Sequence, residues 1–138
     1  MVDESGPLTF AALERRFGLP EPPGDTDDFP LPAWYRSVRE VPLPQLRVGD
    51  ISRACRQQLY VDYMVPLALA ALDANPLAGE LYEGELLISL KSVPLAYWGQ
   101  HTVERQAVVS VVERVRRSPG TPDDIRTEAG ELRSRVQS

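Results

Sequence analysis

Apolar residues recur along most of the chain at the three- and four-residue spacing that is typical of amphipathic α-helices. The first such stretch covers residues 10–17, where Thr9 can act as the N-cap and Gly18 can end the helix. Residues 19–32 follow, rich in proline and aspartate. Because proline fixes φ and removes a backbone donor, we expect this stretch to be stiff and extended.

Two further short helices are predicted before the middle of the chain. Pro32 suits the first position of a helix that runs to about Glu40, since its missing N–H has no intrahelical partner there. Asp50 can cap a helix from Ile51 to about Leu59. Both helices are short, in keeping with the 13 prolines that interrupt the sequence.

Residues 63–74 read YMVPLALAALDA and are apolar on nearly every side. A helix that is apolar all round is typically buried, so we expect this one to lie at the centre of the fold. Its leucines point in different directions and are all expected to be largely buried: Leu67, Leu69 and Leu72.

The second half of the chain continues the helical pattern. A helix is predicted over residues 84–93 and a single turn over residues 94–99. In residues 102–117 the valines recur at spacings of three to five, which favours a helix although valine itself favours strands. The fold class predicted is all-α, a single small domain of five to seven short helices around the central apolar helix.

The composition changes after Ser118, where two prolines and a glycine interrupt the pattern. The last stretch keeps only a thin apolar stripe, weakened by Gly130. We therefore expect a helical domain over residues 1–117 and a C-terminal tail over residues 118–138, formed by a marginal helix that is detached, frayed or flexible.

Composition excludes several functional classes. The hydrophobic fraction of 43% in 138 residues is that of an ordinary globular domain. The longest apolar run, Met64 to Leu72, is far shorter than the roughly 20 residues that span a bilayer, and no signal peptide pattern is present. The net charge of −5 argues against binding to nucleic acid. We expect a cytoplasmic protein that contacts neither nucleic acid nor membrane.

No pattern in the sequence predicts catalysis, a cofactor or a metal site. The chain has one cysteine, Cys55, and one histidine, His101, which are too few for a disulfide or a usual zinc site. A catalytic pair formed by these two residues is less probable than a buried, inert thiol and an ordinary histidine. The sequence therefore predicts a protein that is not an enzyme.

Acidic residues are concentrated in two stretches without any Lys or Arg. One lies between Arg16 and Arg36 and holds four acids from Glu21 to Asp28; the other lies between Arg56 and Lys91. Such stretches indicate either a solvated face or a docking surface for a basic protein. Tyr82 lies among the acids of the second stretch and is a candidate anchor for a binding partner. The alternative is that Tyr82 packs beneath the turn and that Glu85 only complements the N-terminus of a helix. The candidate docking residues are Asp62, Asp73, Glu80, Tyr82, Glu83 and Glu85.

Several ordered motifs resemble a known bacterial family. They are REVPL at 39–43 with Asp50, QQ at 57–58, YMVPLAL at 63–69 with Leu72, NPLA at 75–78, YEGELL at 82–87 and Trp98. Together these motifs are similar to the immunity proteins of contact-dependent growth inhibition systems, the CdiI-type helical family. The resemblance covers about residues 8–117. The family usually has Asp where this chain has Glu85, a change that keeps the charge.

The resemblance implies an immunity protein that binds and neutralises a cognate toxin domain in the cytoplasm without catalysis, a toxin–antitoxin-like pairing. The partner that it implies is the toxin's C-terminal domain, with a basic nuclease as one option and a deaminase or pore-forming domain as others. An acidic surface suits a basic nuclease, because it steers association and blocks access to the nucleic acid. The alternative is a helical scaffold or regulatory module that binds another protein and has no link to toxin neutralisation.

Overall fold

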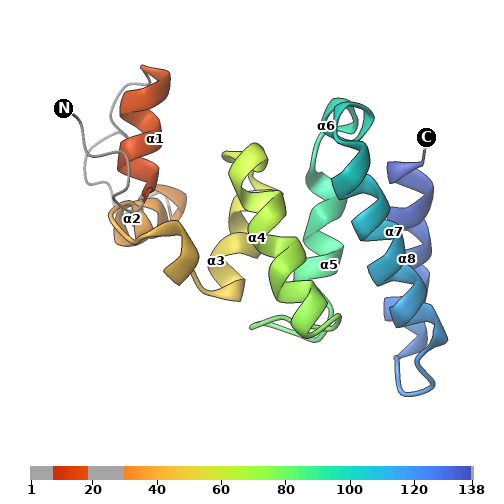
Figure 1. Ribbon diagram of the computed structural model, residues 1–138. Helices are drawn as coiled ribbons and strands as arrows, with labels where there is room; N and C mark the ends of the chain where they lie inside the picture. Colours follow the sequence, from red (N-terminus) through yellow and green to blue (C-terminus); the bar gives the residue numbers. More distant parts are fainter. Residues whose placement is uncertain (1–7, 19–29, 138) are drawn as a thin grey trace. The chain divides into compact units, whose positions relative to one another are not determined.

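The computed structural model describes residues 8–18 and 30–137 (Figure 1). All regular structure in these residues is helical, which confirms the all-α prediction. The α-helices are α1 (Phe10–Phe17), α2 (Pro30–Val38), α3 (Val48–Arg56), α4 (Val61–Ala74), α5 (Glu85–Ser89), α6 (Leu95–Gln100), α7 (Thr102–Arg117) and α8 (Asp123–Val136). Short 3₁₀ turns, η1 (Leu43–Gln45) and η2 (Leu90–Ser92), follow α2 and α5. Of the stretch expected to be extended, residues 19–29 lie outside the described residues, and residues 30–32 are helical, because they belong to α2.

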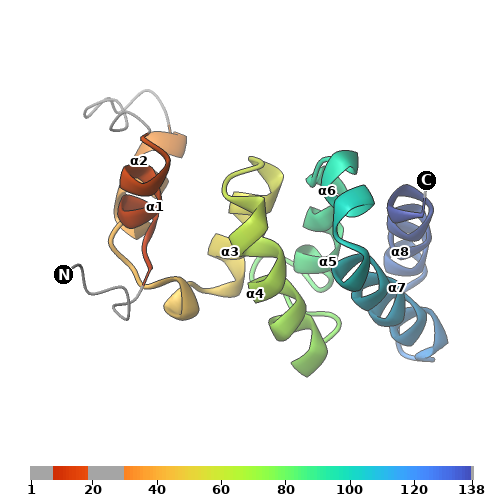
Figure 2. The ribbon, with the colours of Figure 1, turned by 45° about the horizontal axis from the view of Figure 1, so that its top comes forward.

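The helices gather in two compact units, residues 1–46 and residues 47–138. The first unit holds α1, α2 and η1, and the second unit holds the other helices. In the second unit α4 packs against α3, α5 and α7, while α8 packs against α7 (Figure 2). The predicted domain boundary after Arg117 lies within the second unit and stays a prediction.

In the first unit, α1 begins and ends where its sequence predicts. The N–H of Ala12 donates to Oγ1 of Thr9 at 3.0 Å, so Thr9 is the N-cap. Gly18 has φ +66°, the left-handed conformation that commonly ends a helix. The ring of Phe10, fully buried, stacks on that of Tyr35 from α2 with a centroid distance of 5.3 Å, which joins the two helices.

The start of α3 differs from the prediction that Asp50 is the N-cap. The helix begins at Val48, and Asp50 is its third residue. From there the carboxylate reaches back and accepts a hydrogen bond from the N–H of Arg47 at 3.1 Å. Asp50 still stabilises this helix end, but as the acidic partner at the third position and not as the cap itself.

The central helix α4 is buried on one face and not on all sides. Its fully buried residues, Met64, Val65, Ala68 and Leu72, recur at helical spacing. Leu72 is therefore buried as predicted, whereas Leu67 and Leu69 are only half-buried. An apolar composition all round predicted complete burial, but the neighbouring helices cover only the face that they contact.

The C-terminal helix α8 is packed, in contrast to the detached or frayed helix that its thin apolar stripe suggested. Its buried residues are the four members of that stripe, Ile125, Ala129, Leu132 and Val136. Polar contacts add to this packing: Arg133 of α8 lies 2.6 Å from Glu113 of α7, and Glu128 accepts from Lys91 of η2 at 2.6 Å. The stripe is thin because α8 covers a surface on one side only.

Candidate functional site

The segment that carries half of the predicted docking residues connects α4 to α5, and we name it the 75–84 loop. Hydrogen bonds fix both of its ends. Oδ1 of Asn75 accepts from the N–H of Leu77 at 3.1 Å, and the carbonyl of Leu77 accepts from the N–H of Gly84 at 2.9 Å. These bonds close the loop on itself immediately before α5 begins.

Two glycines allow the tight course of this loop. A Cβ at Gly79 would clash with the backbone carbonyl of Tyr82, so a larger residue does not fit there. Gly84 has φ +84°, where a side chain is strained, and its missing Cβ leaves room for Ile125 of α8. The loop is therefore held in one shape by its own sequence.

Glu85, the first residue of α5, holds the tip of the loop from inside. Its carboxyl oxygen Oε1 accepts hydrogen bonds from the backbone N–H groups of Glu80 at 2.9 Å and of Leu81 at 3.1 Å. Its second oxygen, Oε2, accepts from Nη1 of Arg56 in α3 at 3.1 Å. With 1% exposure, Glu85 is closed to a docking partner and supports the loop instead.

The hydrogen bonds to Glu85 also change its acidity. Burial by itself raises the pKa of this carboxyl, but the N–H groups of Leu81 and Glu80 and the guanidinium of Arg56 outweigh it. The net effect is a pKa below the ordinary value. Glu85 is therefore an ionised carboxylate that the fold requires in its charged form.

The tip of the loop presents two large apolar side chains to solvent. Leu81 is 77% exposed and Tyr82 is 48% exposed, so Tyr82 does not pack beneath the turn. Glu80 and Glu83 on either side are also exposed. Sequence reasoning identified Tyr82 but missed Leu81, because nothing in the pattern separates an exposed leucine from a buried one.

Asp62 and Asp73 lie apart from this loop cluster, at the two ends of α4 beside α7. Oδ1 of Asp62 is 3.9 Å from Nε2 of His101, which precedes α7. Oδ1 of Asp73 is 3.6 Å from Nη1 of Arg114 near the end of α7. Both carboxylates are largely exposed and border the contact between the two helices.

The acidic stretch that lacks bases in sequence receives them through the fold. Arg56 contacts Glu85, Arg114 contacts Asp73, and Nε of Arg47 lies 3.9 Å from Oε1 of Glu80. Within the described residues, Glu83 forms no ion pair of this kind and is exposed at the loop tip. Glu85 is thus removed from the acidic surface, whereas Asp62, Asp73, Glu80 and Glu83 stay exposed.

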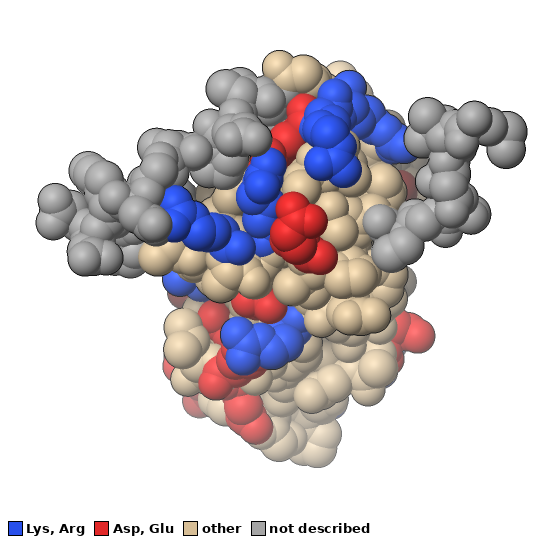
Figure 3. All heavy atoms as spheres, turned by 90° about the vertical axis from the view of Figure 1, so that its left-hand side faces the viewer, with Lys and Arg blue, Asp and Glu red and all other residues tan. Residues whose placement is uncertain are grey.

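The described residues of the first unit hold more basic than acidic side chains. Figure 3 shows basic side chains gathered beside a few acidic ones on this face. Its described charged residues are Arg15, Arg16, Arg36 and Arg39 against Glu14 and Glu40. Glu14 is buried and accepts from Nη2 of Arg39 at 2.7 Å and from the hydroxyl of Tyr35 at 2.6 Å. The acids from Glu21 to Asp28 lie outside the described residues.

The single cysteine and the single histidine have different surroundings. Cys55 is fully buried in α3, and burial raises the pKa of its thiol to about 12, so the nucleophilic thiolate is not formed near neutral pH. Nδ1 of His101 lies 2.8 Å from the carbonyl oxygen of Tyr97, and the two rings stack. His101 is held as part of the α6–α7 junction.

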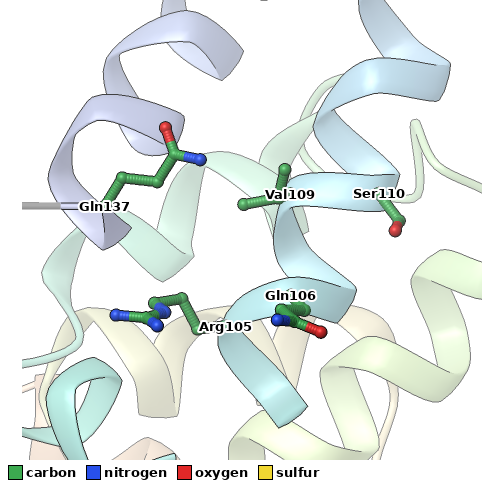
Figure 4. A pocket seen from close by; sticks show the side chains of 5 residues that line it. All are labelled: Arg105, Gln106, Val109, Ser110 and Gln137. Atoms are coloured by element: carbon green, nitrogen blue, oxygen red, sulfur yellow. The ribbon is translucent and has the colours of Figure 1, made fainter. Parts of the chain in front are cut away.

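A surface pocket of about 560 Å³ lies between α7 and the end of α8 (Figure 4). It is lined by Arg105, Gln106, Val109, Ser110 and Gln137. This lining has no carboxylate, imidazole or thiol to exchange a proton, so it does not form an acid–base site. Among the described residues, no cluster of His, Cys, Asp and Glu could hold a metal ion, and no helix is long and apolar enough to cross a membrane.

A family model described as CDI immunity proteins matches residues 19–108. The chain belongs to this family. The match confirms the resemblance to contact-dependent growth inhibition immunity proteins and includes α2 to α6, the 75–84 loop and the first part of α7. Helices α1 and α8 lie outside it. Comparison with curated proteins finds no match to this CDI immunity protein.

Family membership assigns the role of a CDI immunity protein and implies a cognate CDI toxin as the partner. The matched motifs have structural roles in this fold. The glycine of the YEGELL motif permits the turn at residue 84, and the following glutamate fixes the loop tip. The motifs thus determine the shape of the loop, and the side chains of Leu81 and Tyr82 at its tip are exposed.

Proposed function

We propose that this CDI immunity protein binds the C-terminal toxin domain of its cognate CDI system in the cytoplasm and neutralises it without catalysis. The observation that carries the proposal is the family match over residues 19–108. The unreactive thiol of the buried Cys55 agrees with inhibition by binding alone.

The surface that supports binding is the exposed tip of the 75–84 loop. Glu80, Tyr82 and Glu83 are the candidate contact residues there. Asp62 and Asp73 are candidate outer contacts, because both are exposed and their ion pairs at 3.6 Å or more are weak. Glu85 supports the binding surface indirectly, by holding the tip in place.

We further propose that the toxin domain is basic, as a nuclease domain with a cationic substrate cleft would be. The net charge of −5 gives long-range attraction to such a partner. Association should then be fast at low ionic strength and should slow as salt screens the charges. Occupation of the cleft by the immunity protein would exclude nucleic acid.

Co-expression with the toxin domain encoded beside this gene tests the proposal. We expect the immunity protein to restore growth and to co-purify with the toxin domain in a fixed ratio. Titration of purified toxin activity distinguishes binding from catalysis, because a binding inhibitor reaches its end point at stoichiometric amounts. Full growth arrest in the presence of the folded immunity protein, or inactivation by a small molar fraction of it, contradicts the proposal.

A further inference from the structure

We propose that Leu81 and Tyr82 together form the apolar anchor of the toxin interface, and that the toxin domain receives them in an apolar hollow rimmed by Lys or Arg. This inference rests on the proposed function and names the surface through which it acts. The juxtaposition that carries it is an exposed Leu–Tyr pair at the tip of a loop whose backbone is fixed from beneath.

The exposure of Leu81 needs a reason beyond the stability of the fold. Burying a leucine side chain contributes about 1.5–3 kcal/mol, and the fold forgoes most of this at a position with 77% exposure. The neighbouring Tyr82 is 48% exposed, so two consecutive residues at the loop tip present apolar surface to solvent. Adjacent exposed apolar side chains on a fixed loop are typical of interaction sites.

The loop is prepared for binding before the partner arrives. The N–H of Leu81 donates to Oε1 of Glu85, so the backbone that carries the leucine is already ordered. Gly79 and Gly84 permit the tight turns on either side. An interface formed by an ordered segment loses less conformational entropy on association, so more of the contact energy appears as affinity.

Charge at the rim of this apolar pair specifies the partner. Glu80 precedes Leu81 and Glu83 follows Tyr82, and both carboxylates are exposed. Glu80 contacts Arg47 only weakly, at 3.9 Å, so it can form an ion pair with a Lys or Arg of the partner instead. The complementary surface therefore has an apolar centre and a cationic rim, in the usual arrangement of hot spots and rims.

The direct test measures binding of the neighbouring toxin domain to full-length Leu81→Ala and Tyr82→Ala. We expect each variant to bind about 30-fold more weakly or worse, as for a buried anchor. Val103→Ala is the matched control, because Val103 in α7 is 78% exposed and lies in another part of the second unit. Its affinity should equal that of the parent. Thermal melts should match the parent in all three variants, since the side chains removed are exposed.

The rim is tested by Glu83→Lys, with Glu40→Lys in the first unit as the control. We expect Glu83→Lys to slow association at low salt and to have a smaller effect at high salt. Glu40→Lys should change the association rate less than Glu83→Lys does. Binding by both anchor variants at parental affinity overturns the inference while the proposed function stands. Absence of binding by the parent protein itself contradicts the proposed function instead.

Discussion

Nη1 of Arg56 lies 3.1 Å from Oε2 of Glu85, although the two residues are 29 positions apart in the sequence. The arginine belongs to α3, and the glutamate begins α5. The same carboxylate accepts two backbone hydrogen bonds from the 75–84 loop. One buried charge therefore connects a core helix to the tip of the exposed loop.

Replacing Arg56 by Ala should destabilise the second unit. The change leaves the buried Glu85 carboxylate with its two N–H donors but without a counter-charge, and loss of a charged hydrogen bond costs about 1.5–3 kcal/mol. Chemical denaturation measures this as a lower free energy of unfolding. Arg47→Ala is the matched control, because its side chain is 73% exposed and its contacts with Asp50 and Glu80, at 3.5 Å and 3.9 Å, are weak. Equal stability of the two variants would contradict a supporting role for Arg56.

Acid should destabilise the protein through two buried glutamates. Hydrogen bonding from Arg39 is the main cause that lowers the pKa of Glu14, and the bonds described above lower that of Glu85. A carboxyl whose pKa is lowered on folding stabilises the folded state fully at pH values above its ordinary pKa of 4.5. This stabilisation is lost as the pH falls through the lowered pKa that the carboxyl has in the folded state.

Free energies of unfolding measured between pH 7 and pH 3 test this expectation. Glu85→Gln should be less stable than the parent at neutral pH and should lose less stability on acidification, because one of the linked protons is removed. Glu83→Gln serves as the control, since Glu83 is exposed at the loop tip. An acid profile of Glu85→Gln that is parallel to that of the parent would show that Glu85 is not one of the responsible groups.

Two leucines of α4 should differ in their contribution to stability. Leu72 is fully buried, so Leu72→Ala should cost about 2–5 kcal/mol, the usual range for a cavity in a core. Leu69 is half-buried, and Leu69→Ala should cost clearly less. Thermal or chemical unfolding of the two variants gives the comparison. Equal losses would mean that α4 is buried on all sides, as its composition alone suggested.

The sequence predicted the helices well because their signals are local. Thr9 and Gly18 bound α1 as expected, and the valine spacing of α7 indicated a helix correctly. Side-chain burial on α4 was predicted less well, because burial depends on which neighbours cover the helix. Leu67 and Leu72 are both leucines in one apolar run, and only the positions of α3, α5 and α7 distinguish them.

The candidate site was predicted in part for the same reason. Four of its residues are neighbours in sequence, so the fold necessarily keeps them together in the 75–84 loop and the start of α5. Glu85 differs from Glu83 because it pairs with Arg56, which lies 29 positions away in the sequence. No local sequence pattern reveals this pairing. The exposure of Leu81 is likewise a result of the course of the loop.

Removal of residues 118–138 tests the predicted domain boundary. The sequence pattern predicts that the shortened chain folds and still protects, whereas the burial of Leu132 and Val136 leads us to expect a large loss of stability. Deleting α8 would also expose the surface of α7 against which it packs. Circular dichroism melts of a chain ending at Arg117 decide between these outcomes. A melting temperature like that of the full chain supports the boundary.

The complete burial of Cys55 has a practical consequence for studying the complex. It is the single cysteine of the chain, and its raised pKa keeps it in the unreactive thiol form at neutral pH. A second cysteine introduced on the surface, for example at Val103, would therefore react alone with a maleimide dye while the protein is folded. The native sequence thus permits single-site fluorescent labelling without replacing its own cysteine. Reaction of Cys55 itself would then report that α3 has opened.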